Sequence, residues 1–417
     1  MDSNSLIWCI AGAATLGVIV RPFGAPEFIW AVLGATALVA LGLLPWRDAL
    51  AAAGKGTDVY LFLGGMMLLA EVARQEGLFD WLAALAVRSA RGSAKRLFLI
   101  VYGVGTLVTI FLSNDATAVV LTPAVYAAAS AARVEPLPYL LICAFIANAT
   151  SFVLPISNPA NLVIFGDHMP PLVTWLAHFT LPSIAAIVVT YIALRFTQRR
   201  ALDQKLAEKV PSPLLSAGGI CVAIGIGLAA VALLAASAVD RPLGLPTFIA
   251  GVVVTIVVLC ISRQSPLPVV RDISWGVLPL VAGLFIVVEG VERTGILGVL
   301  VRLLQEADAA SPRAAAFDAG VIAAFASNLL NNLPTGLIAA TVSQSADAPL
   351  QLRSGLLIGV DLGPNLSVTG SLATILWLTA LRREGELVTA WQFLKLGIVV
   401  MPPALLTALA ALFWMSP

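Results

Sequence analysis

Apolar segments close to the length of a membrane span recur along this chain and restrict the folds open to it. A transmembrane helix needs about 17 to 25 residues, and apolar runs near that length occupy 6–20, 27–44, 58–73 and 394–413. Hydrophobic residues make up 59% of the 417 residues and charged residues 11%, whereas about a quarter of the residues of a soluble protein are charged. The sequence therefore predicts a multi-pass membrane protein. Because the alternating pattern of a membrane barrel is absent, the spans are expected to be helices.

Charge and cysteine content argue against several classes of function. No Lys or Arg precedes the first apolar run, so a cleaved signal peptide is not expected and the first helix should remain. The formal net charge of +1 gives no indication of a nucleic-acid partner. The cysteines lie singly in predicted spans without a CxxC spacing, at Cys9, Cys143, Cys221 and Cys260. The sequence therefore predicts no metal site, no disulfide framework, no cofactor and no catalytic residue.

Two peptide patterns occur twice and indicate an internal repeat. RPFGAPEF at 21–28 recurs as RPLGLPTF at 241–248, an offset of 220 residues. LLAEVARQEGLF recurs as IVVEGVERTGIL, which aligns Glu71 with Glu289 at an offset of 218 residues. The second offset also pairs polar residues of the two copies, Asn114 with Asn332 and Thr117 with Thr335.

The repeat predicts an all-α polytopic membrane protein of two inverted-topology repeats, 1–196 and 214–417, joined by a cytoplasmic linker over 197–213. Each repeat is expected to hold about five transmembrane helices, one re-entrant helical hairpin, a broken helix and an interfacial helix, the last near 78–88 or 296–304. With the N-terminus outside, most of the 24 Lys and Arg residues fall on the cytoplasmic side, as they do in membrane proteins generally. Inverted repeats are characteristic of secondary transporters, which bind solute near the midplane where broken helices meet.

Polar residues gather at four expected breaks inside the apolar body, at 113–117, 147–161, 331–335 and 359–371. Irregular backbone at membrane depth is tolerated only where protein or a water-filled cavity covers it, so the breaks are expected to converge on one cavity. Its candidate solute-binding residues are Ser113, Asn114, Asp115, Thr117, Asn148, Asn158, Asn161, Asn331, Asn332, Thr335, Asp361, Asn365 and Ser371. Amides donate and accept hydrogen bonds without charge, and the four stretches hold no Lys or Arg. Such a lining favours a small neutral polyhydroxylated solute over a strong anion.

Two acids at membrane depth are candidates for proton coupling, Asp115 and Asp361. An acid at the centre of a membrane helix costs about 2.5 to 3.5 kcal/mol, so a functional role is favoured over a structural one. For a single intramembrane amide the alternative is a hydrogen bond between helices, worth about 0.6 kcal/mol. Glu71 and Glu289 lie near predicted helix ends close to Arg residues, where an ion pair is an equally good interpretation.

Three segments resemble the ArsB-type arsenite efflux permeases of the ion transporter superfamily. FLSNDATAVVLTP at 111–123 and GVDLGPNLSVTGSLATILWL at 359–378 are similar to the signature segments of that family, and SNPANLVIF at 157–165 to the matching break of the first half. One departure is the Asn331-Asn332 pair, which stands where the second tip would otherwise carry an acid.

The resemblance implies export of trivalent arsenic and antimony as neutral hydroxides across the bacterial inner membrane, in exchange for protons or with a separate cytoplasmic ATPase subunit. By the pattern of that family, the resemblance also implies four site residues in this sequence, Asn114, Asp115, Asn332 and Asp361. The chain has no P-loop of its own, so an ion gradient is its expected energy source. The expected partners are the metalloid hydroxide, protons and the lipid bilayer.

Two other functions fit the same pattern. Paired acids and free carbonyl groups can also hold sodium, so a sodium/proton antiporter on the same scaffold is the main alternative. A channel or receptor-like membrane module is a second alternative, but the inverted duplication argues against it.

The predicted topology can be tested with single cysteines in a cysteine-free background. We expect Lys205→Cys in the linker to react with a membrane-impermeant thiol reagent only from the cytoplasmic side, and Ala309→Cys only from the outside. Labelling of Lys205→Cys in intact cells would show that the orientation is reversed.

Overall fold

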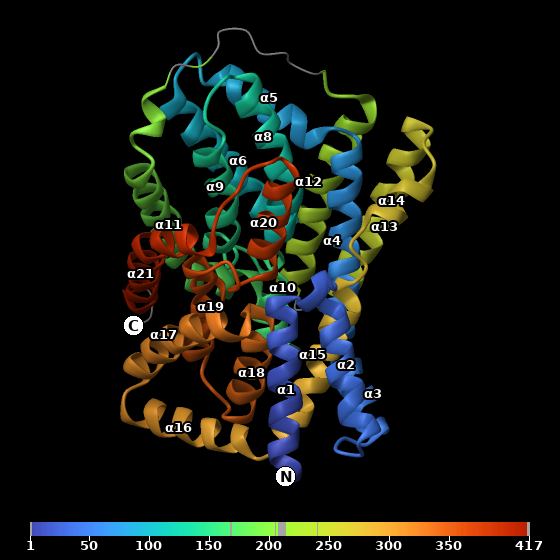
Figure 1. Cartoon of the computed structure of the whole chain (residues 1–417), viewed down its shortest axis with the longest axis vertical. Coiled ribbons are helices and arrows are strands. Elements are labelled where there is room, and N and C mark those ends of the chain that lie inside the picture. Colours follow the sequence, from blue (N-terminus) through green and yellow to red (C-terminus); the bar gives the residue numbers. More distant parts are fainter. Residues whose placement is uncertain (1, 167–168, 205, 207–213, 240, 415–417) are drawn as a thin grey trace.

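The computed structural model describes residues 2–166, 169–204, 206, 214–239 and 241–414, and all its regular elements over these residues are helices (Figure 1). Eight of the described helices are long and apolar enough to cross a membrane, or nine if one bent pair of helices forms a single span. The predicted all-α polytopic fold is therefore confirmed. Lys205 and residues 207–213 of the predicted linker lie outside the described residues.

The first half of the chain forms a series of helices up to residue 197. Its elements are α1 (Ser3–Val20), α2 (Glu27–Ala40), α3 (Trp46–Lys55), α4 (Thr57–Gln75), α5 (Leu78–Ser89), α6 (Ala94–Leu112), α7 (Asn114–Ala116), the π-helical η2 (Thr117–Leu121), α8 (Thr122–Ala131), α9 (Leu137–Ala149), η3 (Pro155–Ser157), α10 (Pro159–Phe165) and α11 (Leu172–Thr197). The bent pair is α3 with α4, which meet at an angle of 50°.

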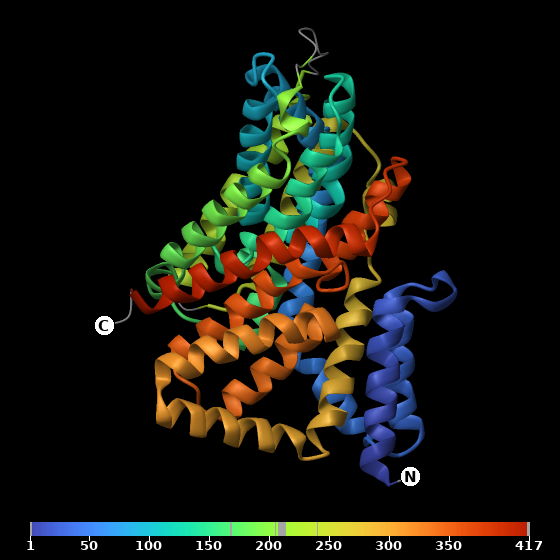
Figure 2. The ribbon, with the colours of Figure 1, turned by 60° about the vertical axis from the view of Figure 1, so that its left-hand side comes forward.

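The second half repeats this order after the short η5 (Ala201–Asp203). Its elements are α12 (Ala217–Ala238), α13 (Gly244–Ser262), α14 (Pro266–Asp272), α15 (Val277–Glu292), α16 (Ile296–Ala310), α17 (Pro312–Leu330), α18 (Asn332–Ser345), α19 (Leu350–Leu362), η6 (Gly363–Leu366), α20 (Leu372–Arg383) and α21 (Ala390–Trp414). In both halves a helical hairpin precedes a broken helix, and a long final helix follows it. The chain therefore consists of two inverted-topology repeats, and α11 and α21 pack side by side (Figure 2).

The repeats interlock through two equivalent close crossings, because α13 packs on α4 while α2 packs on α15. A side chain at Gly65 would place its Cβ 2.3 Å from the carbonyl oxygen of Thr247, and one at Gly283 would place it 2.8 Å from the carbonyl carbon of Ala31. Gly65 and Gly283 are separated by the repeat offset of 218 residues. The same backbone contact is therefore formed twice, once from each repeat.

Each helical hairpin returns to the interfacial helix from which it started. In the first repeat α5 packs on both α6 and α8, and in the second α16 packs on both α17 and α18. Figure 1 shows α5 near the top of the molecule and α16 at the bottom, with the two hairpins pointing toward the middle. The hairpins therefore enter from opposite ends, as a pair of re-entrant hairpins should.

Buried tryptophans bond carbonyl groups in and beside the broken helices. The indole Nε1 of Trp175 donates to the carbonyl oxygens of Phe152 and Val153, at 3.2 and 3.3 Å. The indole of Trp377 on α20 donates to the carbonyl oxygen of Leu140 on α9, at 2.8 Å. Carbonyl groups that lose their helical partner need such donors at membrane depth, so the contacts of Trp175 stabilise the first break, while that of Trp377 joins α20 to α9.

The close crossing predicts a sharp difference between two glycine substitutions. We expect Gly65→Ala to lower the free energy of unfolding by about 1–3 kcal/mol, because the added methyl group overpacks the α4–α13 contact. Gly12→Ala on α1 is the control, since a Cβ at that position meets nothing within 4 Å. Thermal unfolding of the purified variants in detergent measures the difference. An unchanged melting temperature for Gly65→Ala would contradict the close-crossing interpretation.

Candidate functional site

Both hairpins reverse at a residue whose backbone conformation is essentially restricted to glycine. The φ and ψ angles are 94° and 162° at Ser113, and 75° and 154° at Asn331. Such a conformation costs on the order of 1–3 kcal/mol and clusters at ligand-binding sites and switches. The two residues are separated by the repeat offset, so the strain lies at the same point of each repeat. The two tips are therefore the natural place to look for a site.

A pocket with about 300 Å³ of empty space lies where the two hairpin tips meet both broken helices, and we call it the central pocket. Its polar lining residues are Asn114, Asp115, Asn158 and Asn332. Its apolar lining residues are Leu63, Pro159, Val277, Leu333, Leu372 and Ala373. Part of that space is open to solvent, and the enclosed volume is about 10 Å³, which is about enough for one water molecule. The central pocket is therefore nearly closed in this structure. Of the predicted site residues, these four are brought together around it.

The central pocket offers hydrogen-bond acceptors that the protein leaves unpaired. The side-chain oxygens Oδ1 of Asn114 and Asn332 are buried without a hydrogen-bond partner, and each residue is 3% exposed. Asp115, which is partly buried, adds a carboxylate and has no ion-pair partner among the described residues. Buried polar atoms are rarely left unpaired. The pocket therefore fits a solute that donates hydrogen bonds.

Asp361 reaches the central pocket only through another side chain. It is 1% exposed and does not line the pocket. The amide Nδ2 of Asn158 donates to its Oδ1 at 2.7 Å, while its Oδ2 has no hydrogen-bond partner. Asn158 belongs to the first broken helix and lines the pocket. It therefore links the pocket to Asp361, the acid of the second broken helix.

Three predicted site residues hydrogen-bond to one another and hold the two broken helices together. The Nδ2 of Asn148 donates to Oδ1 of Asn365 at 3.0 Å, and its Oδ1 accepts from the hydroxyl of Ser371 at 3.2 Å. Thr374, which sequence reasoning missed, accepts a further bond from Asn148 at 3.3 Å. The sequence feature that could have indicated Thr374 is its position three residues after Ser371, at the end of the second break. None of these side chains lines the central pocket.

Three other predicted site residues form hydrogen bonds within the breaks and hairpins, two of them to the backbone and one to a hydroxyl group. Asn161 donates to the carbonyl oxygens of Ser151 and Leu154, at 2.9 and 3.1 Å. The hydroxyl of Thr335 donates to the carbonyl oxygen of Asn331, at 2.9 Å. The hydroxyl of Thr117 lies 2.8 Å from that of Thr109, across the first hairpin. These three residues therefore stabilise the shape of the breaks and tips.

A first vestibule of about 660 Å³ leads from the central pocket toward the α5 end of the molecule. Four residues line both spaces, Leu63, Asp115, Pro159 and Val277. The first vestibule also contains Ser113, Glu71 and Asp272, and no Lys or Arg lines it. Asp115 therefore lies at the junction between the pocket and this end of the molecule.

A second vestibule of about 1090 Å³ opens toward the α16 end and is the repeat-related counterpart of the first. It contains Glu289 and Leu337, which match Glu71 and Val119 of the first vestibule at the repeat offset. No lining residue is shared with the central pocket. On α18, Leu333 lines the pocket while Leu337, about one turn further along, lines this vestibule. The central pocket thus communicates with one end only.

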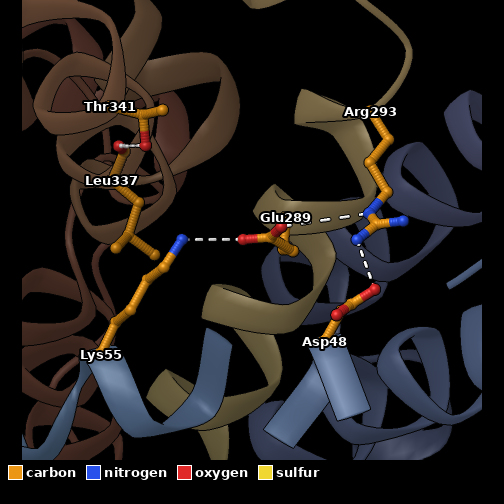
Figure 3. A network of polar contacts seen from close by, with 6 residues as sticks. All are labelled: Asp48, Lys55, Glu289, Arg293, Leu337 and Thr341. Carbon is orange, nitrogen blue, oxygen red and sulfur yellow. Dashed lines mark hydrogen bonds and ion pairs between the residues drawn. The ribbon is translucent and has the colours of Figure 1, made fainter. Parts of the chain in front are cut away.

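Glu71 and Glu289, which are equivalent positions of the two repeats, both form ion pairs. Lys55 lies 2.8 Å from Glu289, and Arg293 lies 2.5 Å from Asp48 (Figure 3). In the first repeat Arg74 contacts both Glu71 and Asp272, at 2.5 and 2.9 Å. Glu71 is buried and Glu289 is partly buried, and a basic side chain that is more exposed neutralises each of them. The ion-pair interpretation of Glu71 and Glu289 is therefore confirmed.

The inverted repeats and the polar pocket between their tips define a membrane transporter. Residues 15–359 match the citrate transporter family, CitMHS. An arsenical pump membrane protein of Yersinia enterocolitica is 30% identical over 83% of this chain and 84% of its own length. A protein of the same name from Escherichia coli is 26% identical over 97% and 98%. The chain therefore belongs to the citrate transporter family and, within it, to the ArsB-type permeases.

Two further relatives extend the comparison. An uncharacterized transporter of Mycobacterium tuberculosis is 27% identical over 92% of both chains. The crystal structure of the Alcanivorax borkumensis YdaH transporter, described as having an unusual topology, aligns with a TM-score of 0.59 over 96% of this chain and 97% of that one. At 17% identity this second likeness concerns the fold alone.

The cysteines lie away from both vestibules and the central pocket. Cys143 is buried on α9, Cys221 is partly buried, and Cys9 and Cys260 are exposed. We therefore expect a variant with all four replaced by Ser or Ala to transport its solute at a rate close to that of the unchanged protein. Transport into everted membrane vesicles measures this rate. Loss of transport in a well-folded Cys143→Ala protein would place a thiol in the site.

Proposed function

We propose that this protein exports trivalent metalloid hydroxides, arsenite and antimonite, across the bacterial inner membrane in exchange for protons. The observation that carries the proposal is the central pocket, where unpaired oxygens of Asn114 and Asn332 meet Asp115 and no cationic side chain is present. The names of the arsenical pump relatives agree with this chemistry.

The proposed solute is a neutral hydroxide that carries three O–H donors. These donors match the carboxamide oxygens of Asn114 and Asn332 and the carboxylate of Asp115. Citrate, which gives the matched family its description, carries several negative charges and would need cationic partners. None lines the central pocket, so the lining favours the neutral hydroxide.

Proton exchange is assigned to Asp115, with Asp361 as a second acid. Burial disfavours the charged form of a carboxyl group, and a vestibule that reaches the acid gives protons a way in and out. If solute binds only to the ionised carboxylate, protonation and solute binding exclude each other at one site, which is the requirement of an antiporter. Asn158 lines the pocket together with Asp115 and donates a hydrogen bond to Asp361, so it joins the surroundings of the two acids.

The direction of export follows from the proposed topology. We propose that the α5 end faces the cytoplasm, because basic residues are frequent in the sequence around α5 and in the predicted linker over 197–213. In this topology the repeats cover 1–196 and 214–417, and the N-terminus is outside. The first vestibule would then load solute from the cytoplasm, and the second would release it. A separate cytoplasmic ATPase subunit is a possible additional partner at the same face.

A sodium/proton antiporter on the same scaffold is the second candidate, because unpaired oxygens beside a carboxylate are also ligands for sodium. Everted vesicles with an imposed pH gradient separate the two. Arsenite that dissipates the gradient and accumulates inside, without ATP, supports the first proposal. Sodium that dissipates the gradient in the absence of any metalloid supports the second. Accumulation that requires ATP would point to the ATPase partner.

Removing the charge of Asp115 should separate proton coupling from solute exchange. We expect Asp115→Asn to slow accumulation of arsenite driven by a pH gradient by about tenfold or more, because the titratable group is lost. Exchange of arsenite across equal pH should continue, since an amide still accepts hydrogen bonds. Asp361→Asn should have a similar or milder effect.

The control for this prediction is Asp318→Asn, the same change at an exposed position of α17. It should leave gradient-driven accumulation unchanged. An Asp115→Asn protein that still concentrates arsenite with normal pH dependence would assign the coupling role to Asp361 instead.

A further inference from the structure

The tip of the second hairpin is hydrogen-bonded to the broken helix of its own repeat. The backbone N–H of Asn332 donates to the carbonyl oxygen of Gly370 at 2.8 Å. The side-chain Nδ2 of Asn331 donates to the carbonyl oxygen of Thr369 at 3.1 Å. These bonds join the turn itself to the segment between η6 and α20.

Asn328, one turn before the tip on α17, adds three more bonds to the same segment. Its Nδ2 donates to the carbonyl oxygen of Gly363 at 2.9 Å, and its Oδ1 accepts from the hydroxyl of Ser367 at 2.7 Å. Its carbonyl oxygen accepts from the hydroxyl of Thr369 at 3.2 Å. A single asparagine thus bonds three positions of the second break.

The first hairpin lacks an equivalent anchor. The residue that matches Asn328 at the repeat offset is Ile110, whose side chain can form no hydrogen bond. One bond joins this arm to its break, from the hydroxyl of Ser157 to the carbonyl oxygen of Ile110 at 3.1 Å. Ser113 forms no side-chain cap, and the chain beyond it enters the π-helical segment Thr117–Leu121, a feature frequent at functional sites. Val119 and Val120 of that segment line the first vestibule.

We propose that Asn328 is a positioning residue that fixes the second tip, so that this tip is the static wall of the site while the first tip, with Asp115, moves during transport. The proposal rests on the proposed function, because it takes the central pocket as the transport site. Both tips hold a strained residue, but the bonds of Asn328 and Asn331 retain the strain in the second. The strain at Ser113 is free to relax, and open space in the first vestibule lies beside it.

The first test is hydrogen–deuterium exchange of the purified full-length protein in nanodiscs, which needs no solute. We expect the amides of 331–337 to exchange more slowly than those of 114–121, by about tenfold or more. In Asn328→Ile, which introduces the residue of the first repeat, exchange at 331–337 should rise toward that of 114–121. Exchange in α4 and α13 should stay unchanged, which controls for global unfolding.

Two results of this test would overturn the proposal. One is equal exchange at the two tips of the unchanged protein, which decides the matter even if Asn328→Ile does not fold. The other is a folded Asn328→Ile protein whose second tip exchanges at the original rate.

The second test introduces reversible crosslinks into the cysteine-free protein. Asn328→Cys with Ser367→Cys replaces a hydrogen bond by a disulfide across the second tip. Ile110→Cys with Ser157→Cys places a matched disulfide across the first. Oxidation should restore arsenite transport in the protein with Asn328→Cys and Ser367→Cys. It should stop transport in the protein with Ile110→Cys and Ser157→Cys. A reducing agent should reverse both effects. A residue with a merely structural role would not produce opposite responses to oxidation.

Each other outcome of the crosslinking test contradicts the proposal. If transport continues with the first tip crosslinked, the first tip does not move during transport. If transport stops with the second tip crosslinked, the second tip does move. If the unchanged protein transports no arsenite, the proposed function fails, whereas the exchange measurement still decides whether Asn328 fixes the tip.

Discussion

The need to bond main-chain polar groups at membrane depth governs this structure. Four points in the chain leave regular helix where no lipid can replace the lost hydrogen bonds. The protein meets this need with side chains of its own, including Asn161 and the indole of Trp175 at the first break and Asn328 at the second. Two amide oxygens that remain unpaired, those of Asn114 and Asn332, line the central pocket beside Asp115, which makes this pocket the candidate binding site.

Much of the fold could be predicted from the sequence, because the repeat is visible as aligned peptides and the breaks are polar segments in apolar surroundings. The hairpins, the interfacial helices and the broken helices lie where the patterns indicated. Which amide side chains line the pocket and which bond other parts of the protein could not be predicted. Asn148 and Asn158 lie ten residues apart in one polar segment, yet the first bonds Asn365 and the second lines the pocket. Only the course of the irregular backbone decides which way each side chain faces.

Electrostatics narrows what the pocket can hold. Lys55 lines the second vestibule, Arg74 contacts Glu71 of the first, and Arg293 lies 4.0 Å from Glu289 of the second. Each of these basic residues is paired with an acid. The central pocket therefore presents acceptor oxygens and one carboxylate without a compensating cation. An anion in such a place would be desolvated without a partner, at a cost of several kcal/mol, whereas a neutral hydroxide loses little. The family shares a scaffold, but the charges inside the pocket select the solute, since function resides in the site rather than in the fold.

Duplication supplied the two tips as equals, and substitutions have since made them different. The same strained turn occurs at Ser113 and Asn331, yet an acid follows the first and an anchored amide the second. A transporter that couples a proton to a solute needs one element whose position depends on charge and another that holds the solute's remaining contacts in place. Two mobile tips would let the pocket lose its shape when the acid is protonated, and two fixed tips would prevent its access from changing. The different bonding of the two tips would meet this requirement under the proposed coupling, while the repeats keep their shared geometry.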